Sequence, residues 1–525
     1  MSEYADLILL SNCIFTATEE IPFSGYIAIK NDRILSIGKG LAPTELIGTN
    51  TKYLDYGNKT ITPGFSDVHC FFTGYSVGFV GIDLSAATSQ EDILNSIKEY
   101  AKGIPADKPI LGHGWNSDTI QPNGTDLLDE AFSTRPVLLF AKGCETCWMN
   151  QAAINRYQFT PETCYPESYV RFLPDLLGDK DFIIPEFKRY IKMMSSKGIT
   201  SIKEMGFDDF YGFTDVLEEM ELNHELTLRI AFMSQPVGAG ANLAYAREAR
   251  ERFRGPFVRF SGFNRMTDRG VWAGLAEMID PYEDTADAGA AGKTVVEEPE
   301  WDLIENELRA IDADGFRYSL HCQGDGAVRR TVALYASLPR DEHGRMLRRH
   351  AITDLENSDP TDLIEFGKLG GICEVYPQIL TLDRREDCLS MMRRQIGETR
   401  LLHSWNRRGM EDSGCTVCCG TDLPLLIPSL GESIYSACGG YFDDGLPVNE
   451  ANVLTLVELL RAWTAGGAYD LMREDELGTL EVGKLADICV LDRDVFDLDY
   501  RDARDLAVDM TMSDGQIVFD RNKEA

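Results

Sequence analysis

The chain has 525 residues and carries 51 Lys and Arg against 85 Asp and Glu, which gives a formal net charge of −34. This acidic balance argues against nucleic acid, whose phosphates require a basic face, and against an anionic membrane surface. Hydrophobic residues make up 44% of the chain, enough for a full core, and no apolar run reaches the ~20 residues that span a bilayer.

Strands are predicted at both ends of the chain, around the turn pairs Asn31-Asp32 and Asp514-Gly515. The predicted strands cover residues 5–16, 26–30, 33–37, 486–491, 508–512 and 516–519. Because the termini of a domain often lie close together, we expect residues 1–58 and 475–525 to form one small β-domain.

The middle of the chain alternates short apolar strands with helical patterns, which is typical of an α/β fold with a parallel sheet. A capping box at residues 88–91 predicts a helix over 93–100, and apolar residues at helical spacing predict helices at 301–312 and 454–463. The predicted strands are 110–112, 136–140, 200–202, 316–320, 371–375 and 416–420.

Three of the seven histidines and one aspartate stand next to predicted strands. They are His69, His321, His350 and Asp422. Because active sites of parallel α/β barrels lie at the carboxyl ends of the strands, these side chains are expected to converge on one metal ion. Imidazole and carboxylate suit zinc, and also manganese or iron. For each histidine taken alone, a structural role is the alternative.

Seven segments resemble motifs of the amidohydrolase superfamily, most closely those of amidohydrolase family 3. They follow one another in family order along the chain. The segments are Pro63–His69, Gly112–Asn116, Gly198–Ile202, His321–Asp325, His350–Ala351, Gly420–Pro424 and Leu480–Asp487. The resemblance implies a TIM-like (β/α)8 barrel over residues 59–474, with a substrate-loop insertion at roughly 72–195. It also implies that the two chain ends form a composite β-sandwich domain.

The resemblance also implies a metal-activated water that attacks a carbonyl carbon. By position, His69, His321, His350 and Asp422 match the metal ligands of the family. Asp422 would also accept the proton of the attacking water and return it to the leaving group. His321 or His350 would bind the metal or stabilise the oxyanion.

Two residues depart from the family pattern at the metal site. Phe71 stands where the family has a second histidine, on the strand face expected to carry His69. Asn264 stands where many relatives have a carboxylated lysine. Cys70 starts on the opposite face, and Lys203 lies in a different motif. Without a bridging ligand two metal ions would repel strongly, so we predict one divalent ion, with zinc preferred over manganese or iron.

Further departures surround the predicted pocket. Glu145 replaces a family histidine, and Tyr376 replaces the glutamine of a Gln-Pro pair. Together with His113, Trp115 and Asn264, these residues are predicted to bind substrate. The changes lie around the site, which favours an altered chemistry or substrate over an inactivated relative.

The leading functional prediction is a metal-dependent hydrolase that acts on a carbonyl of a small amide-like substrate, cyclic or open. One alternative is a C–C bond hydrolase that opens a cyclic diketone. Others are a metal-free isomerase or lyase that uses Asp422 with His321, and a non-catalytic protein that binds small molecules on the same scaffold. An acidic N-terminus and an odd count of 13 cysteines favour a cytoplasmic protein, and base rates favour a homodimer.

Overall fold

The structure is a computed structural model that describes residues 4–122, 124–144, 146–164, 171–206, 212–235, 240–287 and 289–524. The chain divides into two compact units. The first unit comprises Met1–Cys70, Ile191–Met205 and Asn223–Ala525, and the second comprises Phe71–Tyr190 and Gly206–Leu222.

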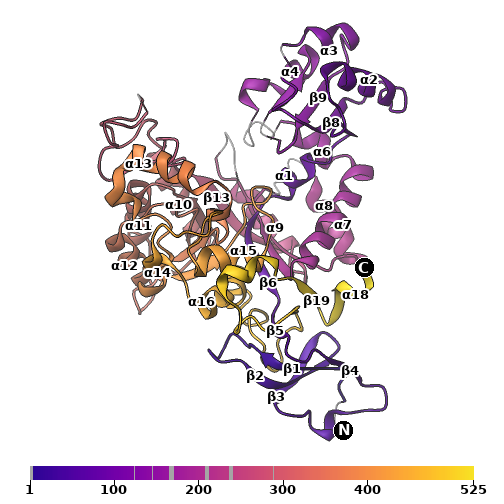
Figure 1. Ribbon diagram of the computed structural model, residues 1–525, viewed down its shortest axis with the longest axis vertical. Coiled ribbons are helices and arrows are strands. Elements are labelled where there is room, and N and C mark those ends of the chain that lie inside the picture. Colours follow the sequence, from indigo (N-terminus) through magenta and orange to yellow (C-terminus); the bar gives the residue numbers. More distant parts are fainter. Residues whose placement is uncertain are drawn as a thin grey trace. The chain divides into compact units, whose positions relative to one another are not determined.

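Eight parallel strands form the centre of the first unit (Figure 1). In sheet order they are β6 (Phe65–Cys70), β11 (Ile199–Glu204), β12 (Arg229–Ser234), β13 (Val258–Met266), β14 (Arg317–His321), β15 (Ala351–Thr353), β16 (Ile372–Val375) and β17 (Thr416–Cys419). A parallel bridge between Cys70 and Leu423 joins the two outer strands. The sheet is therefore nearly closed, and the predicted (β/α)8 barrel is confirmed.

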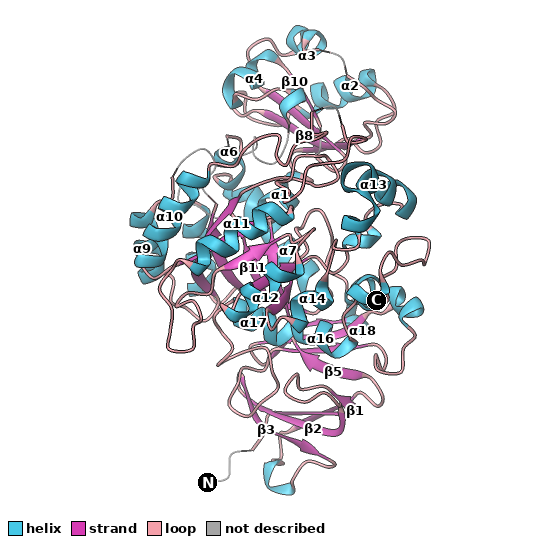
Figure 2. Cartoon of the chain, turned by 90° about the vertical axis from the view of Figure 1, so that its left-hand side faces the viewer, coloured by secondary structure: helices cyan, strands magenta, loops and turns pink. Residues whose placement is uncertain are grey.

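Helices lie against the outside of this barrel (Figure 2). The helices of the first unit after β12 are α9 (Leu243–Arg252), α10 (Trp301–Ala313), α11 (Asp325–Ala336), α12 (Pro360–Lys368), α13 (Arg385–Leu401), α14 (Arg407–Asp412), α15 (Leu430–Ser433), α16 (Leu456–Arg461), α17 (Gly467–Asp470) and α18 (Arg521–Glu524). In α10, Trp301, Ile304, Leu308 and Ile311 are buried, and their helical spacing places them on one face.

The two ends of the chain meet in a second sheet of the first unit. Its strands are β1 (Leu7–Ile14), β2 (Phe23–Lys30), β3 (Arg33–Lys39), β4 (Lys52–Asp55), β5 (Thr60–Pro63), β18 (Ile488–Leu491), β19 (Val508–Ser513) and β20 (Gln516–Asp520). Antiparallel pairing of β5 with β18 joins the N-terminal and C-terminal strands. Ile61, Ile488 and Met510 share one buried cluster, so both ends contribute to the same core.

A buried arginine joins this sheet region to the barrel. Arg229, on β12, donates two hydrogen bonds of 2.9 Å to the Asp487 carboxylate and one of 2.8 Å to Asp514. The side chains of Arg229 and Asp487 are 1% and 3% exposed, so the charges are removed from water. Each of these two charges can be buried because the other one neutralises it.

Asp487→Ala is therefore expected to destabilise the protein by about 3 kcal/mol, because the buried guanidinium keeps only two of its four hydrogen bonds, those to Asp514 and to the Pro256 carbonyl. Denaturant unfolding of the variant measures this loss. Glu365→Ala is the matched control, because Glu365 forms an exposed ion pair with Lys368 and should contribute less than about 1 kcal/mol. Equal stability of both variants would contradict the prediction.

The second unit has its own sheet and core. A four-stranded sheet contains β7 (Ile82–Asp83), β8 (Ile110–Trp115), β9 (Val137–Ala141) and β10 (Cys147–Met149). Its helices are α1 (Phe72–Val77), α2 (Gln90–Tyr100), α3 (Asp126–Ala131), α4 (Gln151–Tyr157), α6 (Leu173–Leu177), α8 (Phe213–Leu222) and most of α7 (Lys180–Ser196). The N-cap of α2 is Ser89, one residue later than the start of the predicted capping box, because the Ser89 hydroxyl accepts a hydrogen bond from the Asp92 backbone N–H. The Asp92 carboxylate in turn accepts from the backbone N–H and the hydroxyl of Thr88.

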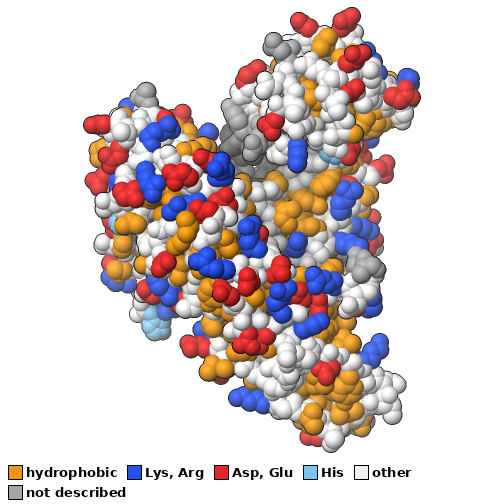
Figure 3. Space-filling model, viewed as in Figure 1, with side chains coloured by type: hydrophobic (Ala, Val, Ile, Leu, Met, Phe, Trp, Pro, Cys, Tyr) orange, Lys and Arg blue, Asp and Glu red, His pale blue; other side chains and the backbone are white. Residues whose placement is uncertain are grey.

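Charged side chains of both signs are interspersed over the face of the molecule in Figure 3. Within the described ranges, no helix combines the length and the apolar character required to cross a membrane.

Candidate active site

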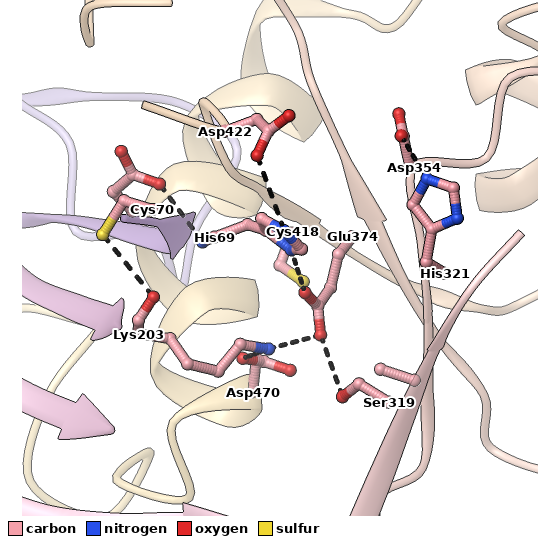
Figure 4. Close-up of polar contacts among 12 residues, drawn as sticks. His69, Cys70, Lys203, Ser319, His321, Asp354, Glu374, Cys418, Asp422 and Asp470 are labelled. Atoms are coloured by element: carbon pink, nitrogen blue, oxygen red, sulfur yellow. Dashed lines mark hydrogen bonds and ion pairs between the residues drawn. The ribbon is translucent and has the colours of Figure 1, made fainter. Parts of the chain in front are cut away.

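Two of the predicted site residues meet at the carboxyl ends of neighbouring barrel strands. His69 lies one residue before the end of β6, and Asp422 follows β17 by three residues. His69 Nε2 lies 3.8 Å from Asp422 Oδ1 (Figure 4). The His69 side chain is 4% exposed and that of Asp422 is 29% exposed, so the pair is partly open to solvent on the Asp422 side.

The turn after β17 packs directly on His69. The backbone N–H groups of Thr421 and Asp422 both donate to the His69 carbonyl oxygen, at 3.2 and 2.8 Å. Asp422 adopts a left-handed conformation with φ 51°. A Cβ atom on Gly420 would lie 2.5 Å from the Cβ of His69, so only glycine permits this approach.

Gly420→Ala is expected to displace His69 and to lower kcat about 10-fold to 100-fold, because a shift of ~1 Å in a reacting group costs rates of that order. Steady-state kinetics on a folded variant measures the effect. Gly289→Ala serves as the control, because a Cβ at Gly289 meets no atom within 4 Å. If both variants match the parent, the close approach of Gly420 has no role in positioning His69.

Asp67 ties the first strand to the same turn. Its carboxylate accepts hydrogen bonds from the backbone N–H groups of His69 and Thr421, at 3.2 and 3.1 Å, and from the Thr421 hydroxyl at 2.5 Å. Burial raises the pKa of Asp67 to about 7, although these hydrogen bonds oppose the rise. The carboxylate therefore fixes the backbone on which His69 stands.

His321 forms an ion pair that the sequence did not reveal. Its Nε2 lies 2.8 Å from Oδ2 of Asp354, the residue that directly follows β15. The amide of Gln323 donates to the same Asp354 oxygen at 2.7 Å. Nδ1 of His321 is buried and has no hydrogen-bond partner among the described residues.

The charges around the site determine its protonation. Burial raises the pKa of Asp422 to about 6; His69 and His321 oppose this rise, and Asp354 adds to it. Burial lowers the pKa of His321, but the nearby carboxylates, Asp354 foremost, outweigh burial and raise it to about 9. At neutral pH, Asp422 is therefore mainly a carboxylate and His321 an imidazolium.

His350 does not join the site, which corrects the sequence-based expectation. It precedes β15 and so lies at the amino end of that strand, whereas Asp354 lies at the carboxyl end. Its Nδ1 accepts from the Tyr318 backbone N–H at 3.0 Å, and its Nε2 lies 3.1 Å from Asp312 of α10. Its ring stacks on Tyr335 of α11 at 5.0 Å. His350 thus packs between strands and outer helices.

Two of the predicted substrate-binding residues lie in the barrel. Asn264, on β13, is aligned with Ser319 of β14, is 2% exposed, and has a buried Oδ1 without a hydrogen-bond partner among the described residues. The ring of Tyr376 meets the ring of His69 edge-on, with 5.5 Å between centroids. A substrate-binding role for both stays a prediction.

The other predicted pocket residues belong to the second unit. Trp115 is 2% exposed in the core of that unit and donates to the Leu139 carbonyl, which corrects its prediction as a substrate contact. His113 Nδ1 lies 2.9 Å from the Val80 carbonyl oxygen. Phe71 is the N-cap of α1, because β6 ends at Cys70. Glu145 lies outside the described residues.

A buried ion network lies beneath His69. Glu374 of β16 contacts His69 through one carboxylate oxygen and Lys203 and Arg317 through the other. Burial alone would raise the pKa of Glu374, but Lys203, His69 and Arg317 together lower it to about 2. Glu374 is therefore ionised across the physiological pH range.

The donors do not form the metal site that the family pattern implies. Among the described residues, no group of three or more His, Cys, Asp or Glu side chains is placed to hold a metal ion. His350 points elsewhere, Asn264 offers only a neutral amide, and Phe71 offers no donor. What remains is the pair His69–Asp422, with His321 already held by Asp354. The described residues therefore do not fit a multidentate metal centre.

Sequence reasoning missed Asp354 and Glu374 and considered Lys203 only as a replacement ligand. Asp354 carries a detectable signal, because it follows a short apolar strand at the position where barrel active-site residues lie. Glu374 and Lys203 are charged residues inside apolar strands, and buried charges require partners. The sequence pattern does not identify which charges pair.

Comparison with known proteins agrees with this architecture. A model of the amidohydrolase family matches residues 52–519. N-substituted formamide deformylase from Arthrobacter pascens is 22% identical over 99% of both chains, and Protein LONG AFTER FAR-RED 3 from Arabidopsis thaliana is 22% identical over 94% of this chain and 88% of its own.

Two solved structures illustrate the shared fold. One, described as an uncharacterized metal-dependent hydrolase from Pyrococcus horikoshii, covers 94% of this chain and 99% of its own, with 18% identity and a TM-score of 0.72. The other, the zinc complex of atrazine chlorohydrolase TrzN from Arthrobacter aurescens, covers 98% and 95%, with 14% identity and a TM-score of 0.54. The motifs and the barrel of the present chain, together with the family match over most of its length, show that this chain belongs to the amidohydrolase family and is a hydrolase.

Proposed function

We propose that this hydrolase cleaves an amide-like C–N bond of a small molecule, with Asp422 as the general base. The observation that carries the proposal is the 3.8 Å approach of His69 and Asp422 at the carboxyl ends of β6 and β17. His321 lowers and Asp354 raises the pKa of Asp422, which supports a position of the His321–Asp354 pair near the same centre. The similarity to N-substituted formamide deformylase supports a C–N bond as the target.

The residues support a simple sequence of proton transfers. The Asp422 carboxylate accepts a proton from water as the water oxygen attacks the substrate carbonyl carbon. The Nδ1–H of the His321 imidazolium donates to the carbonyl oxygen as negative charge develops there. Asp422 then returns its proton to the leaving nitrogen. One amide and one water thus yield one carboxylic acid and one amine.

A single divalent ion, zinc in preference to manganese or iron, stays a prediction. Structural neighbours described as metal-dependent or zinc-bound support it. The potential metal ligands among the described residues do not support a metal ion, so the proton transfers given above involve only the chain's own residues. Elemental analysis of protein purified without added metal is the test: about one equivalent supports the single ion, and about two would require a bridging ligand not identified here. Retained turnover in metal-free protein would support catalysis without it.

Hydrolysis in heavy-oxygen water tests the proposed reaction directly. A panel of N-substituted formamides, N-acyl amines and cyclic amides should yield one heavy oxygen in each acid and an equal amount of amine. Cyclic diketones in the same panel test the alternative of C–C cleavage, which forms an acid without an amine. Binding of these compounds without turnover of any of them would favour a non-catalytic role.

The pH dependence follows from the two shifted groups. Because Asp422 must be ionised, kcat/KM is expected to rise with pH through about 6; because His321 must be protonated, it should fall through about 9. Asp354→Asn removes the carboxylate that raises the His321 pKa, so the alkaline fall should move to lower pH while the acid limb changes less. An unchanged alkaline limb would exclude His321 as the proton donor.

A further inference from the structure

Glu374 connects the candidate site to charges buried below it. It lies within β16 and is 0% exposed, and its Oε2 lies 3.3 Å from His69 Nδ1. Its Oε1 accepts from the Lys203 ammonium, from Arg317 Nη2 at 3.1 Å and weakly from the Ser319 hydroxyl at 3.5 Å. Figure 4 shows His69 between Asp422 on one side and Glu374 on the other.

The cations that hold Glu374 share a second carboxylate. Lys203 Nζ lies 2.8 Å from Asp470 Oδ2, and Arg317 Nη2 lies 2.6 Å from Asp470 Oδ1. Arg317 Nη1 also donates to the Asp470 carbonyl at 2.5 Å. The four charged side chains, from β11, β14, β16 and α17, are each 0% exposed, and their formal charges sum to zero.

Stability alone is a weak explanation for such a network. Burying four charges requires their desolvation, and buried ion pairs are often no more stable than apolar residues of similar volume. The network does, however, have a geometric consequence for the site. A carboxylate fixed at Nδ1 of a histidine selects the tautomer with a proton on Nδ1 and sets the orientation of the ring.

We propose that Glu374, held by Lys203 and Arg317, is the positioning residue that keeps the proton of neutral His69 on Nδ1 and directs Nε2 toward Asp422. The Nε2 lone pair then faces the reacting centre. The inference rests on the proposed function only in assigning His69 and Asp422 to that centre. It also accounts for the burial of Lys203 and Arg317 in the barrel strands, because they hold the Glu374 carboxylate in place.

The tautomer of His69 is directly measurable. Nitrogen-15 labelling of the seven histidines, with His69→Asn to assign the signal, distinguishes protonated from unprotonated ring nitrogens by chemical shift. In the parent protein, neutral His69 should show a protonated Nδ1 and an unprotonated Nε2. The opposite tautomer, or a mixture of the two, would overturn the proposal without any variant of the network.

A charge-balanced variant tests the contribution of Glu374. Glu374→Gln combined with Lys203→Met removes one negative and one positive charge, so the remaining Arg317 and Asp470 still balance. In this variant His69 should lose its single tautomer, and kcat should fall about 10-fold to 100-fold with a smaller change in KM. An unchanged His69 spectrum in the folded variant would overturn the proposal.

The matched control is Glu307→Gln. Glu307 is also a buried carboxylate with an arginine and a hydroxyl partner, Arg265 and Tyr318, but none of the contacts that define the network involves it. It should leave the His69 spectrum unchanged. If the His69 tautomer depends on the network but the protein hydrolyses no amide, the positioning role of Glu374 stands and the proposed function is rejected. The two proposals can therefore fail independently.

Discussion

Asp422→Asn is expected to lower kcat by about 10²–10⁴-fold while leaving the fold intact, because an amide cannot accept the proton that the carboxylate takes from water. The substitution preserves side-chain volume, and the backbone N–H of Asp422 still donates to the His69 carbonyl. The partial exposure of Asp422 also limits the structural cost of the change. Turnover on the best substrate of the amide panel, together with circular dichroism and thermal unfolding, measures the effect.

Asp387→Asn is a suitable control for this experiment. Asp387 lies in the first turn of α13 with its side chain 64% exposed, so the substitution should leave kcat unchanged. If Asp422→Asn retains activity within a few-fold of the control, Asp422 is not the base. The search would then turn to Asp354, the other partly exposed carboxylate of the site.

His321→Leu is expected to lower kcat about 10²–10³-fold, because it removes the group that we propose as the hydrogen-bond donor to the developing oxyanion. Leucine fills most of the ring volume, and Asp354 retains the hydrogen bond from the Gln323 amide, which limits the loss of stability. Steady-state kinetics should show the loss mainly in kcat, since the interaction strengthens in the transition state.

His350→Leu provides the comparison for His321→Leu. His350 packs against Tyr335 and bonds Asp312 behind the strands, so its loss should reduce stability and leave the kcat of the folded fraction nearly unchanged. A large kcat effect at His350 with none at His321 would reverse the assignment of the two residues.

The barrel could be predicted because its signals are local. Short apolar strands alternate with amphipathic helices, and each motif lies beside its strand. The role of His350 could not be predicted, because it depends on where a three-residue strand begins. β15 starts one residue after His350, and that single boundary places His350 at the amino end and Asp354 at the carboxyl end. Strand boundaries are the least reliable part of a sequence-based prediction.

The network below His69 illustrates a different limit. The ion pairs among Lys203, Arg317, Glu374 and Asp470 join residues that lie 57 to 267 positions apart in the sequence. Each is visible as a charge in or near an apolar segment, but the pairing exists only after the strands adopt their barrel order. His69 and Asp422 could be proposed as site residues because motif resemblance identifies residues, whereas contacts between motifs require the fold.

The charge balance under His69 also constrains how this barrel can change over evolutionary time. Loss of Lys203 alone leaves a surplus negative charge in the buried interior, and loss of Glu374 alone leaves a surplus positive one. A lineage therefore reaches an uncharged interior most readily by exchanging both residues in close succession. In relatives that share this active-site arrangement, the two positions should covary, either both charged or both neutral, and directed evolution at either position should succeed mainly in libraries that randomise the pair.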